Sequence, residues 1–143
     1  MKNLFKSCTS LISLDFSNIN TNNLVDMEGM FSDWDSLISL NLSNFNTEKV
    51  TNMIELFYDC YSLSSIDLSN FDTKNVKDMN NMFSGCTDII SLNLSNFNTK
   101  NVESMGSMFS DCNYLISIDI SKFETQNVKY MTSMFDNCHS LKY

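Results

Sequence analysis

The chain has 143 residues and a net charge of −8, and its nine basic residues are all lysines. Nucleic acids and anionic membrane surfaces bind through clustered cations, so this balance argues against both as partners and favours a cationic or polar one. No stretch of roughly 18 apolar residues occurs and the first residues lack the apolar core of a signal peptide, so we expect neither membrane insertion nor an export signal in this chain.

The sequence repeats with a constant period of 26 residues, without insertion or deletion. Two residue types show the period throughout: Phe5, Phe31, Phe57, Phe83, Phe109 and Phe135; Met27, Met53, Met79, Met105 and Met131. A fixed period of this size indicates stacked units, each of which buries its apolar side against its neighbours. We therefore predict a single solenoid over residues 1–143, of about five and a half repeats.

Both ends of the chain fall inside a repeat, since Met1 aligns with Met27 and the last repeat stops at Tyr143. Solenoids need polar capping units to shield their first and last apolar layers. We therefore expect the solenoid to be open at both ends. Such a chain is either a segment of a longer array or a product that covers its ends by end-to-end self-association.

Each repeat contains the pattern of one half-buried strand. Leu40 and Leu42 alternate with Ser39 and Asn41, and the same alternation recurs at residues 63–68 and 92–94. Stacking the turns in register would place these strands in a parallel sheet, with about 4.8 Å between neighbouring strands.

A second apolar segment follows a recurring threonine that turns the chain, and its apolar residues lie at i, i+3, i+6 and i+7, as in Val76, Met79, Met82 and Phe83. This spacing predicts a short helix or 3₁₀ segment, capped by Thr73 or Asn75. Residue types that tolerate a left-handed conformation follow and would end the helix: Asp33, Asp59, Gly85, Asp111 and Asn137. The expected fold is an α/β repeat solenoid, a leucine-rich-repeat-like arc with strands inside and helices on the convex side.

The pattern Leu-x-x-Leu-Asp-Leu-Ser-Asn-Phe-x-Thr-x-x-Val-x-x-Met-x-x-Met-Phe-x-x-Cys runs along the whole chain. It resembles the 26-residue repeat of BspA-like leucine-rich-repeat surface proteins. The resemblance implies a surface-displayed array used for attachment or protein binding. It also implies a cell-surface or extracellular location, which the residues themselves do not indicate.

The five cysteines hold one equivalent position in the repeat, and Trp34 fills that position in the remaining turn: Cys8, Cys60, Cys86, Cys112 and Cys138. Interchange with tryptophan indicates an apolar packing position, so we expect buried free thiols. The alternative is a disulfide between adjacent turns, Cys60–Cys86 or Cys112–Cys138. Zinc would need paired ligands two to four residues apart, and the chain has none.

No arrangement of residues predicts an enzyme, a metal site or a cofactor. His139 is the single histidine, and its equivalents in other repeats are variable polar residues, which indicates an exposed position. The ten methionines occupy mostly core positions rather than a copper-binding cluster. Asp33 and Asp35 flank Trp34 without the further ligands of a calcium loop, so we interpret them as a solvated acidic edge.

The outward positions of the strands form three regular columns: Ser13, Ser39, Ser65, Ser91 and Ser117; Asp15, Asn41, Asp67, Asn93 and Asp119; Ser17, Ser43, Ser69, Ser95 and Ser121. The ten residues of the first two columns are the candidate binding residues. The alternation of Asp and Asn either relieves repulsion between stacked carboxylates or offers acceptors to a ligand. If this face does not bind, Tyr58, Tyr61 and Trp34 on the convex side are the next candidates.

These patterns predict a non-enzymatic module that binds a protein or other macromolecule, and the resemblance implies that it is part of a longer surface array. The alternative is a structural spacer, or a solenoid that assembles end to end without a dedicated ligand.

Overall fold

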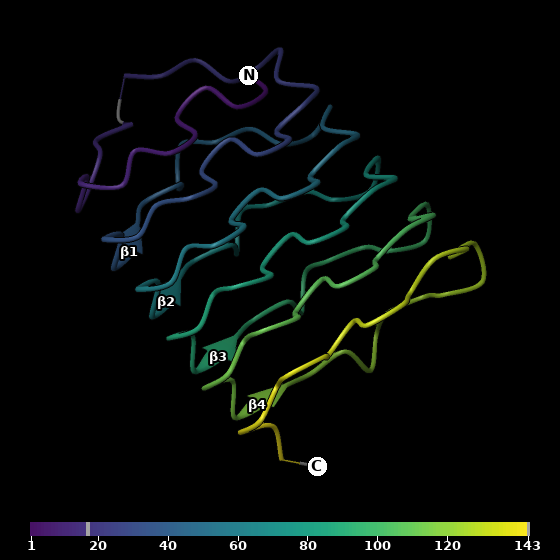
Figure 1. The fold of residues 1–143 in the computed structure, drawn as a ribbon. Coiled ribbons are helices and arrows are strands. Elements are labelled where there is room, and N and C mark those ends of the chain that lie inside the picture. The colour runs from purple at the N-terminus through teal and green to yellow at the C-terminus, as the bar shows by residue number, and fades with distance from the viewer. Residues whose placement is uncertain (17, 143) are drawn as a thin grey trace.

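The structure is a computed structural model that describes residues 1–16 and 18–142. The chain winds through a stack of flat turns that progress from the N-terminus to the C-terminus (Figure 1). Short parallel strands recur once per 26 residues, as the period predicts, and the described residues contain four of them: β1 (Ser39–Leu40), β2 (Ser65–Ile66), β3 (Ser91–Leu92) and β4 (Ser117–Ile118).

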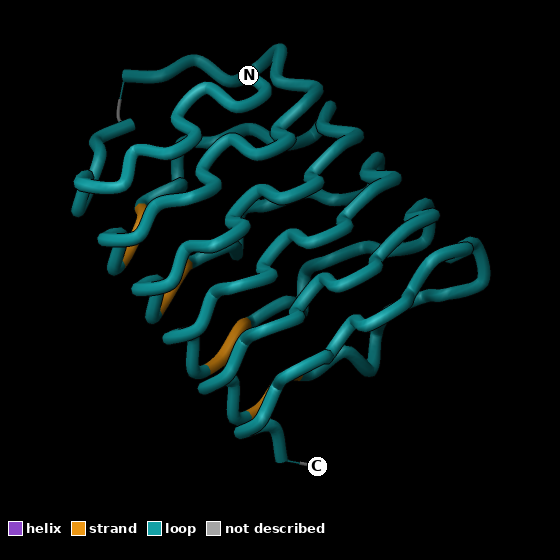
Figure 2. Tube along the Cα trace, in the orientation of Figure 1, coloured by secondary structure: helices purple, strands orange, loops and turns teal. Residues whose placement is uncertain are grey.

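The four strands line one edge of the stack (Figure 2). β1 pairs in parallel with β2, and β3 pairs with β4, so that Ser39 lies opposite Ser65 and Ser91 opposite Ser117. The expected continuous sheet is therefore divided into two two-stranded sheets. A more continuous parallel ladder lies elsewhere in the repeat, in bridges that link one residue of each successive turn: Asp26, Asn52, Asp78, Ser104 and Tyr130.

The predicted helix is wrong: the described residues contain no helix. In its place the segment from Met53 to Cys60 makes tight turns, with Leu56 N–H donating to the carbonyl oxygen of Met53 at 3.3 Å. Other N–H groups donate to the next turn, as Phe57 does to Met82 at 2.9 Å. These bonds between turns replace the i→i−4 bonds of a helix, and consecutive tight turns produce the same apolar spacing of three to four residues.

Left-handed residues explain why the segment does not coil into a helix. The expected positions do have positive φ, at 60°, 54°, 76°, 60° and 57°: Asp33, Asp59, Gly85, Asp111 and Asn137. A second series lies four residues earlier and is not evident from the sequence: Asn3, Gly29, Glu55, Asn81, Ser107 and Ser133. Two left-handed residues per repeat interrupt a right-handed helix. Glu55 and Asp59 each occupy the third position of a tight turn, closed by Leu56 N–H to Met53 and by Cys60 N–H to Phe57, where type II turns require positive φ.

The core is a set of stacked side-chain columns, as the constant period predicts. The phenylalanine rings at the repeat position form one continuous stack with centroids 5.3–6.0 Å apart. Phe57, Phe83 and Phe109 are fully buried, whereas Phe5 and Phe135 in the outer turns are half-buried.

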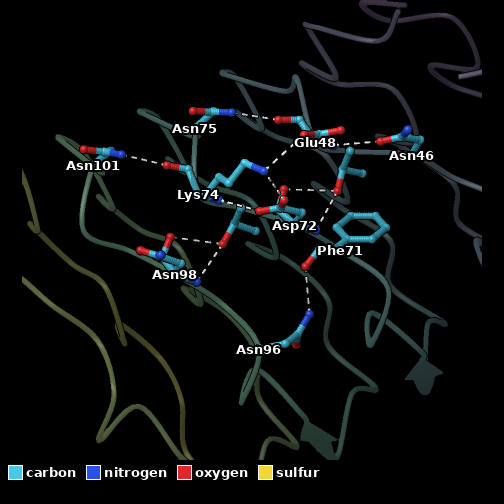
Figure 3. A network of polar contacts seen from close by, with 11 residues as sticks. Asn46, Glu48, Phe71, Asp72, Lys74, Asn75, Asn96, Asn98 and Asn101 are labelled. Carbon is cyan, nitrogen blue, oxygen red and sulfur yellow. Dashed lines mark hydrogen bonds and ion pairs between the residues drawn. The ribbon is translucent and has the colours of Figure 1, made fainter. Parts of the chain in front are cut away.

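Buried threonines hold adjacent turns together. Their hydrogen-bond partners Asp72 and Asn98 are part of the polar network in Figure 3. The Thr73 hydroxyl accepts a hydrogen bond from Asn98 N–H at 2.8 Å and donates to the Asn98 carbonyl oxygen at 3.0 Å. Thr47 and Thr99 bond Asp72 and Glu124 in the same way. The threonine therefore joins two turns, rather than capping a helix.

Candidate functional site

All ten candidate residues, named here the Ser/Asx face, are exposed at the strand edge. The surface over them is shallow. One depression of about 510 Å³ lies over β1 and β2, and another of about 450 Å³ lies over β3 and β4. Such a surface suits contact with another macromolecule better than enclosure of a small molecule. Binding by these residues stays a prediction.

The Asp/Asn column of this face has a local structural role. The side-chain oxygens of Asn41, Asp67, Asn93 and Asp119 accept hydrogen bonds from the backbone N–H two residues later, at 2.9–3.1 Å. Carboxylate and amide oxygens serve equally well as acceptors in such Asx turns, which explains why Asp and Asn alternate freely here. The charge itself is not needed for the turn, so the face can vary its charge without changing its shape.

These turns also hold the aspartates in the ionised form. The backbone N–H and the hydroxyl of Ser69 lower the pKa of Asp67, and the corresponding groups of Ser121, hydroxyl first, lower the pKa of Asp119. Ion pairs lie elsewhere in the repeat: Lys74 binds Glu48 at 3.2 Å and Asp72 at 3.0 Å. The Ser/Asx face therefore presents ionised acceptors at neutral pH.

An exposed isoleucine column, which the strand pattern does not predict, lies beside the Ser/Asx face. Ile38, Ile90 and Ile116 are 54%, 52% and 42% exposed, and Ile12 occupies the same repeat position. Ser64 interrupts the column. The signal is present as the recurring Ile one residue before the outward serine, but the two-residue strand period does not say that this position is exposed.

The isoleucine column borders a depression of about 380 Å³, lined by Ser64, Asp88, Ile90, Tyr114, Ile116 and Ser140. Backbone hydrogen bonds join its turns, since Ile116 N–H donates to the Ile90 carbonyl oxygen at 2.9 Å. Large exposed apolar side chains that gather in one place mark interaction surfaces more often than single exposed ones do.

A polar groove of about 480 Å³ is formed by other columns of the repeat, and its residues are Asn75, Lys77, Asn101, Glu103, Asn127 and Lys129. The Asn75, Asn101 and Asn127 amides donate to carbonyl oxygens of the preceding turn at 2.7–2.8 Å. Lys129 pairs with Glu103 at 2.6 Å. The groove's side chains largely satisfy one another or the backbone.

The structure exposes only part of the second set of candidate binding residues, Trp34, Tyr58 and Tyr61. Trp34 is fully buried, so its assignment to a binding surface is wrong; its indole N–H donates to the carbonyl oxygen of Phe5. Tyr61 is exposed, and desolvation together with neighbouring Asp59 raises its pKa to about 12. Tyr58 is half-buried, and the Asp59 carboxylate raises its pKa as well. Among the described residues, no convex helix presents these side chains.

The thiols occupy the apolar positions expected of them. All five cysteines are free; Cys60, Cys86 and Cys112 are buried, and Cys8 and Cys138 are half-buried. Burial raises the pKa of Cys60 and of Cys112 to about 12 and that of Cys86 well above its usual value. A nucleophilic cysteine needs a lowered pKa, so these thiols are not activated. His139 is exposed, as expected.

Within residues 1–16 and 18–142, no group of three or more His, Cys, Asp or Glu side chains is placed to hold a metal ion. Over the same residues, no helix is long and apolar enough to cross a membrane.

The 26-residue turns, the parallel strand pairs and the stacked side-chain columns define a repeat protein of the solenoid class. The chain belongs to the family described as "Mycoplasma protein of unknown function, DUF285", which matches residues 1–112 and 65–143. The two matches overlap and together span the chain. Neither the comparison with curated proteins nor the comparison with solved structures gives a match.

Proposed function

We propose that this chain is a non-enzymatic module that binds a protein or other macromolecule through the Ser/Asx face, as part of a longer surface array. The observation that carries the proposal is the regularity of that face: small serines and Asx acceptors recur in register from turn to turn, with Ser39 opposite Ser65. Small side chains let a partner approach the backbone, and ionised Asp67 and Asp119 supply acceptors for Lys or Arg.

Two further observations support this role. The buried, unactivated thiols and the shallow surface favour binding over catalysis. The repeat pattern resembles that of BspA-like leucine-rich-repeat surface proteins, whose arrays are used for attachment. By that resemblance we propose adhesion as the specific role and the cell surface or extracellular space as the location.

The expected affinity comes from several columns together. An exposed ion pair contributes only about 0–1 kcal/mol, so a useful contact must engage more than one aspartate. Because exposed charges are screened by salt, binding should weaken steeply between about 50 and 500 mM NaCl.

The test uses a triple variant, Asp15→Asn, Asp67→Asn and Asp119→Asn, which keeps the Asx acceptors and removes three charges. Capture of a panel of purified extracellular-matrix proteins is measured by surface plasmon resonance. The matched control removes three exposed charges elsewhere, by Asp35→Asn, Glu124→Gln and Asp136→Asn. Loss of capture in the first variant alone supports the proposal. Equal capture by both variants, or no capture by the unmodified chain, contradicts it.

The second candidate function is a structural one, in which solenoids stack end to end. The outer turns carry exposed apolar side chains, among them Leu4 at 50% and Met131 at 42%, whereas their respective equivalents in inner turns, Leu56 and Met105, are buried. Sedimentation velocity over a hundredfold range of concentration distinguishes the two functions. Growth of linear oligomers would favour stacking, and a constant monomer would exclude it.

A further inference from the structure

We propose that the isoleucine column docks an amphipathic α-helix of a partner protein, with the helix lying along the solenoid axis and its Lys or Arg side chains beside the aspartates. The inference rests on the proposed function, because it assigns a chemistry to the partner. It starts from Ile38, Ile90 and Ile116, each roughly half exposed at one repeat position.

These isoleucines have no internal role that explains them. The neighbouring apolar positions Leu37, Ile89 and Leu115 are fully buried and already fill the core of their turns. Ser64 stands at the same position in the third turn and leaves the β2 register intact, so the fold does not need an apolar residue there. Apolar side chains that are exposed to solvent at the same position of several repeats therefore indicate a contact surface.

The spacing of the column favours a helix. Hydrogen-bonded turns lie about 4.8 Å apart, so the column offers one isoleucine position every 4.8 Å or so. A helix rises about 1.5 Å per residue, and its i, i+3, i+7 stripe places an apolar side chain on average about every 5.2 Å. Over the four steps from Ile12 to Ile116 the mismatch grows to roughly 2 Å, which side chains can absorb. An extended strand repeats about every 6.7 Å on one face and loses register within about two turns.

The charges near the column match the same helix. Asp15, Asp67 and Asp119 occur in every second turn, about 9.6 Å apart, and one helical heptad spans about 10.5 Å. One Lys or Arg per heptad would therefore meet one aspartate. On the other flank, Asp88 lines the depression together with Ile90 and Ile116. An apolar column with a series of aspartates on one flank and Asp88 on the other fits a helix that has an apolar stripe and basic flanks.

The probe is a labelled 21-residue peptide with Leu at the first and fourth positions of each heptad and Lys at the fifth, used at nanomolar concentration to limit its self-association. Binding to the whole chain is followed by fluorescence anisotropy. A peptide of the same composition with Leu at alternate positions tests the helix requirement. A peptide with Glu in place of Lys tests the charge requirement. The unmodified chain should bind the first peptide at least about tenfold more tightly than either control.

Two variants of the chain test the column itself. Ser64→Ile completes the column and should tighten binding about fivefold to tenfold, since it adds one buried aliphatic side chain. The double variant Ile90→Ser and Ile116→Ser should weaken binding more than tenfold. Both substitutions introduce serine, the residue that the third turn already has at this position as Ser64, so the fold should tolerate them. Val25→Ser, an exposed apolar residue at another repeat position, is the matched control and should leave binding unchanged.

The helix proposal is overturned if the unmodified chain binds no peptide, if the alternating peptide binds equally well, or if Ser64→Ile and the double serine variant leave binding unchanged. Its failure is distinguishable from that of the proposed function. If capture of matrix proteins depends on the three aspartates but is unchanged by the isoleucine variants, the proposed function is supported and the helix proposal is rejected.

Discussion

The thiol of Cys86 donates a hydrogen bond to the main-chain carbonyl oxygen of Phe57 in the preceding turn, at 3.1 Å. Cys60, Cys112 and Cys138 make the same bond to Phe31, Phe83 and Phe109 at 3.0–3.2 Å. In the turn that lacks the cysteine, Trp34 donates its indole N–H to Phe5. The position therefore requires an apolar side chain that also carries a hydrogen-bond donor, which accounts for the interchange of Cys and Trp.

The three buried thiols should be unreactive in the folded chain and should make its stability fall at alkaline pH. Burial raises the pKa of Cys60 and Cys112 to about 12, so at pH 8 they carry almost no thiolate, and iodoacetamide should label them only after unfolding. A folded pKa above the unfolded value means that this stabilisation is complete below about pH 9 and is lost as pH rises toward 12. Urea unfolding at pH 8 and pH 10.5 measures the loss.

The control for the alkaline effect is a chain with Cys60→Ala, Cys86→Ala and Cys112→Ala, in which the decrease between the two pH values should be smaller. Rapid labelling of Cys60, Cys86 or Cys112 in the native chain at pH 8 would contradict the buried, neutral assignment.

Thr73→Val should destabilise the chain by roughly 1–3 kcal/mol, because it leaves the N–H and carbonyl of Asn98 without their shared hydroxyl partner in a buried site. Thr125→Val changes the equivalent position in the last turn, where the threonine is exposed, and should alter the free energy of unfolding by less than about 0.5 kcal/mol. Equal effects of the two substitutions in urea unfolding would show that the hydroxyl bridge does not stabilise the stack.

Gly85→Ala should destabilise the chain by roughly 1–3 kcal/mol. Gly85 has a φ of +76°, where an L-residue is strained, and a Cβ would lie 2.2 Å from Asp59 Oδ1 and 3.1 Å from Asp59 Cα. Gly106 has no positive φ, and a Cβ there would lie 3.0 Å from its nearest neighbour, Asn80 Oδ1. Gly106→Ala should therefore cost less in thermal unfolding, and the reverse order would contradict the left-handed assignment of Gly85.

Asp67→Asn and Asp67→Ala should separate the acceptor of the Asx turn from its charge. The asparagine variant keeps the acceptor for Ser69 N–H and should retain the stability of the chain at pH 7, whereas the alanine variant should lose part of it. Because the folded pKa of Asp67 is lowered, its stabilisation is present above pH 4 or so and is lost as pH falls through the lowered value. Unfolding measured at pH 7 and at pH 3 should show that the free energy of unfolding decreases less on acidification in the asparagine variant than in the unmodified chain.

The sequence indicated which side chains occupy equivalent positions in the repeats, but it did not indicate for every position whether the side chain is exposed or buried. The strand period correctly placed Ser39 and Asn41 outside and Leu40 inside. It did not identify Ile38 as exposed, because Ile38 and Ser39 are consecutive and both face solvent between buried Leu37 and Leu40, which a two-residue period does not produce. Trp34 was misplaced because the two aspartates beside it suggested a solvent-facing turn, whereas its interchange with cysteine indicated the packing position in which the structure fully buries its indole.

By itself the sequence determined the period, the columns and the core, since a repeat without insertions places equivalent residues such as Phe57 and Phe83 in equivalent positions and stacking then follows. Only the tertiary structure decided the backbone conformation of the segment from Met53 to Cys60 and of its equivalents in the other repeats. Spacing of three to four residues suits both a helix and a run of tight turns, and the choice depends on hydrogen bonds such as Phe57 N–H to the Met82 carbonyl oxygen, which exist only when the next turn is in place. Those bonds between turns, together with left-handed Glu55 and Asp59, favour the turns over the helix.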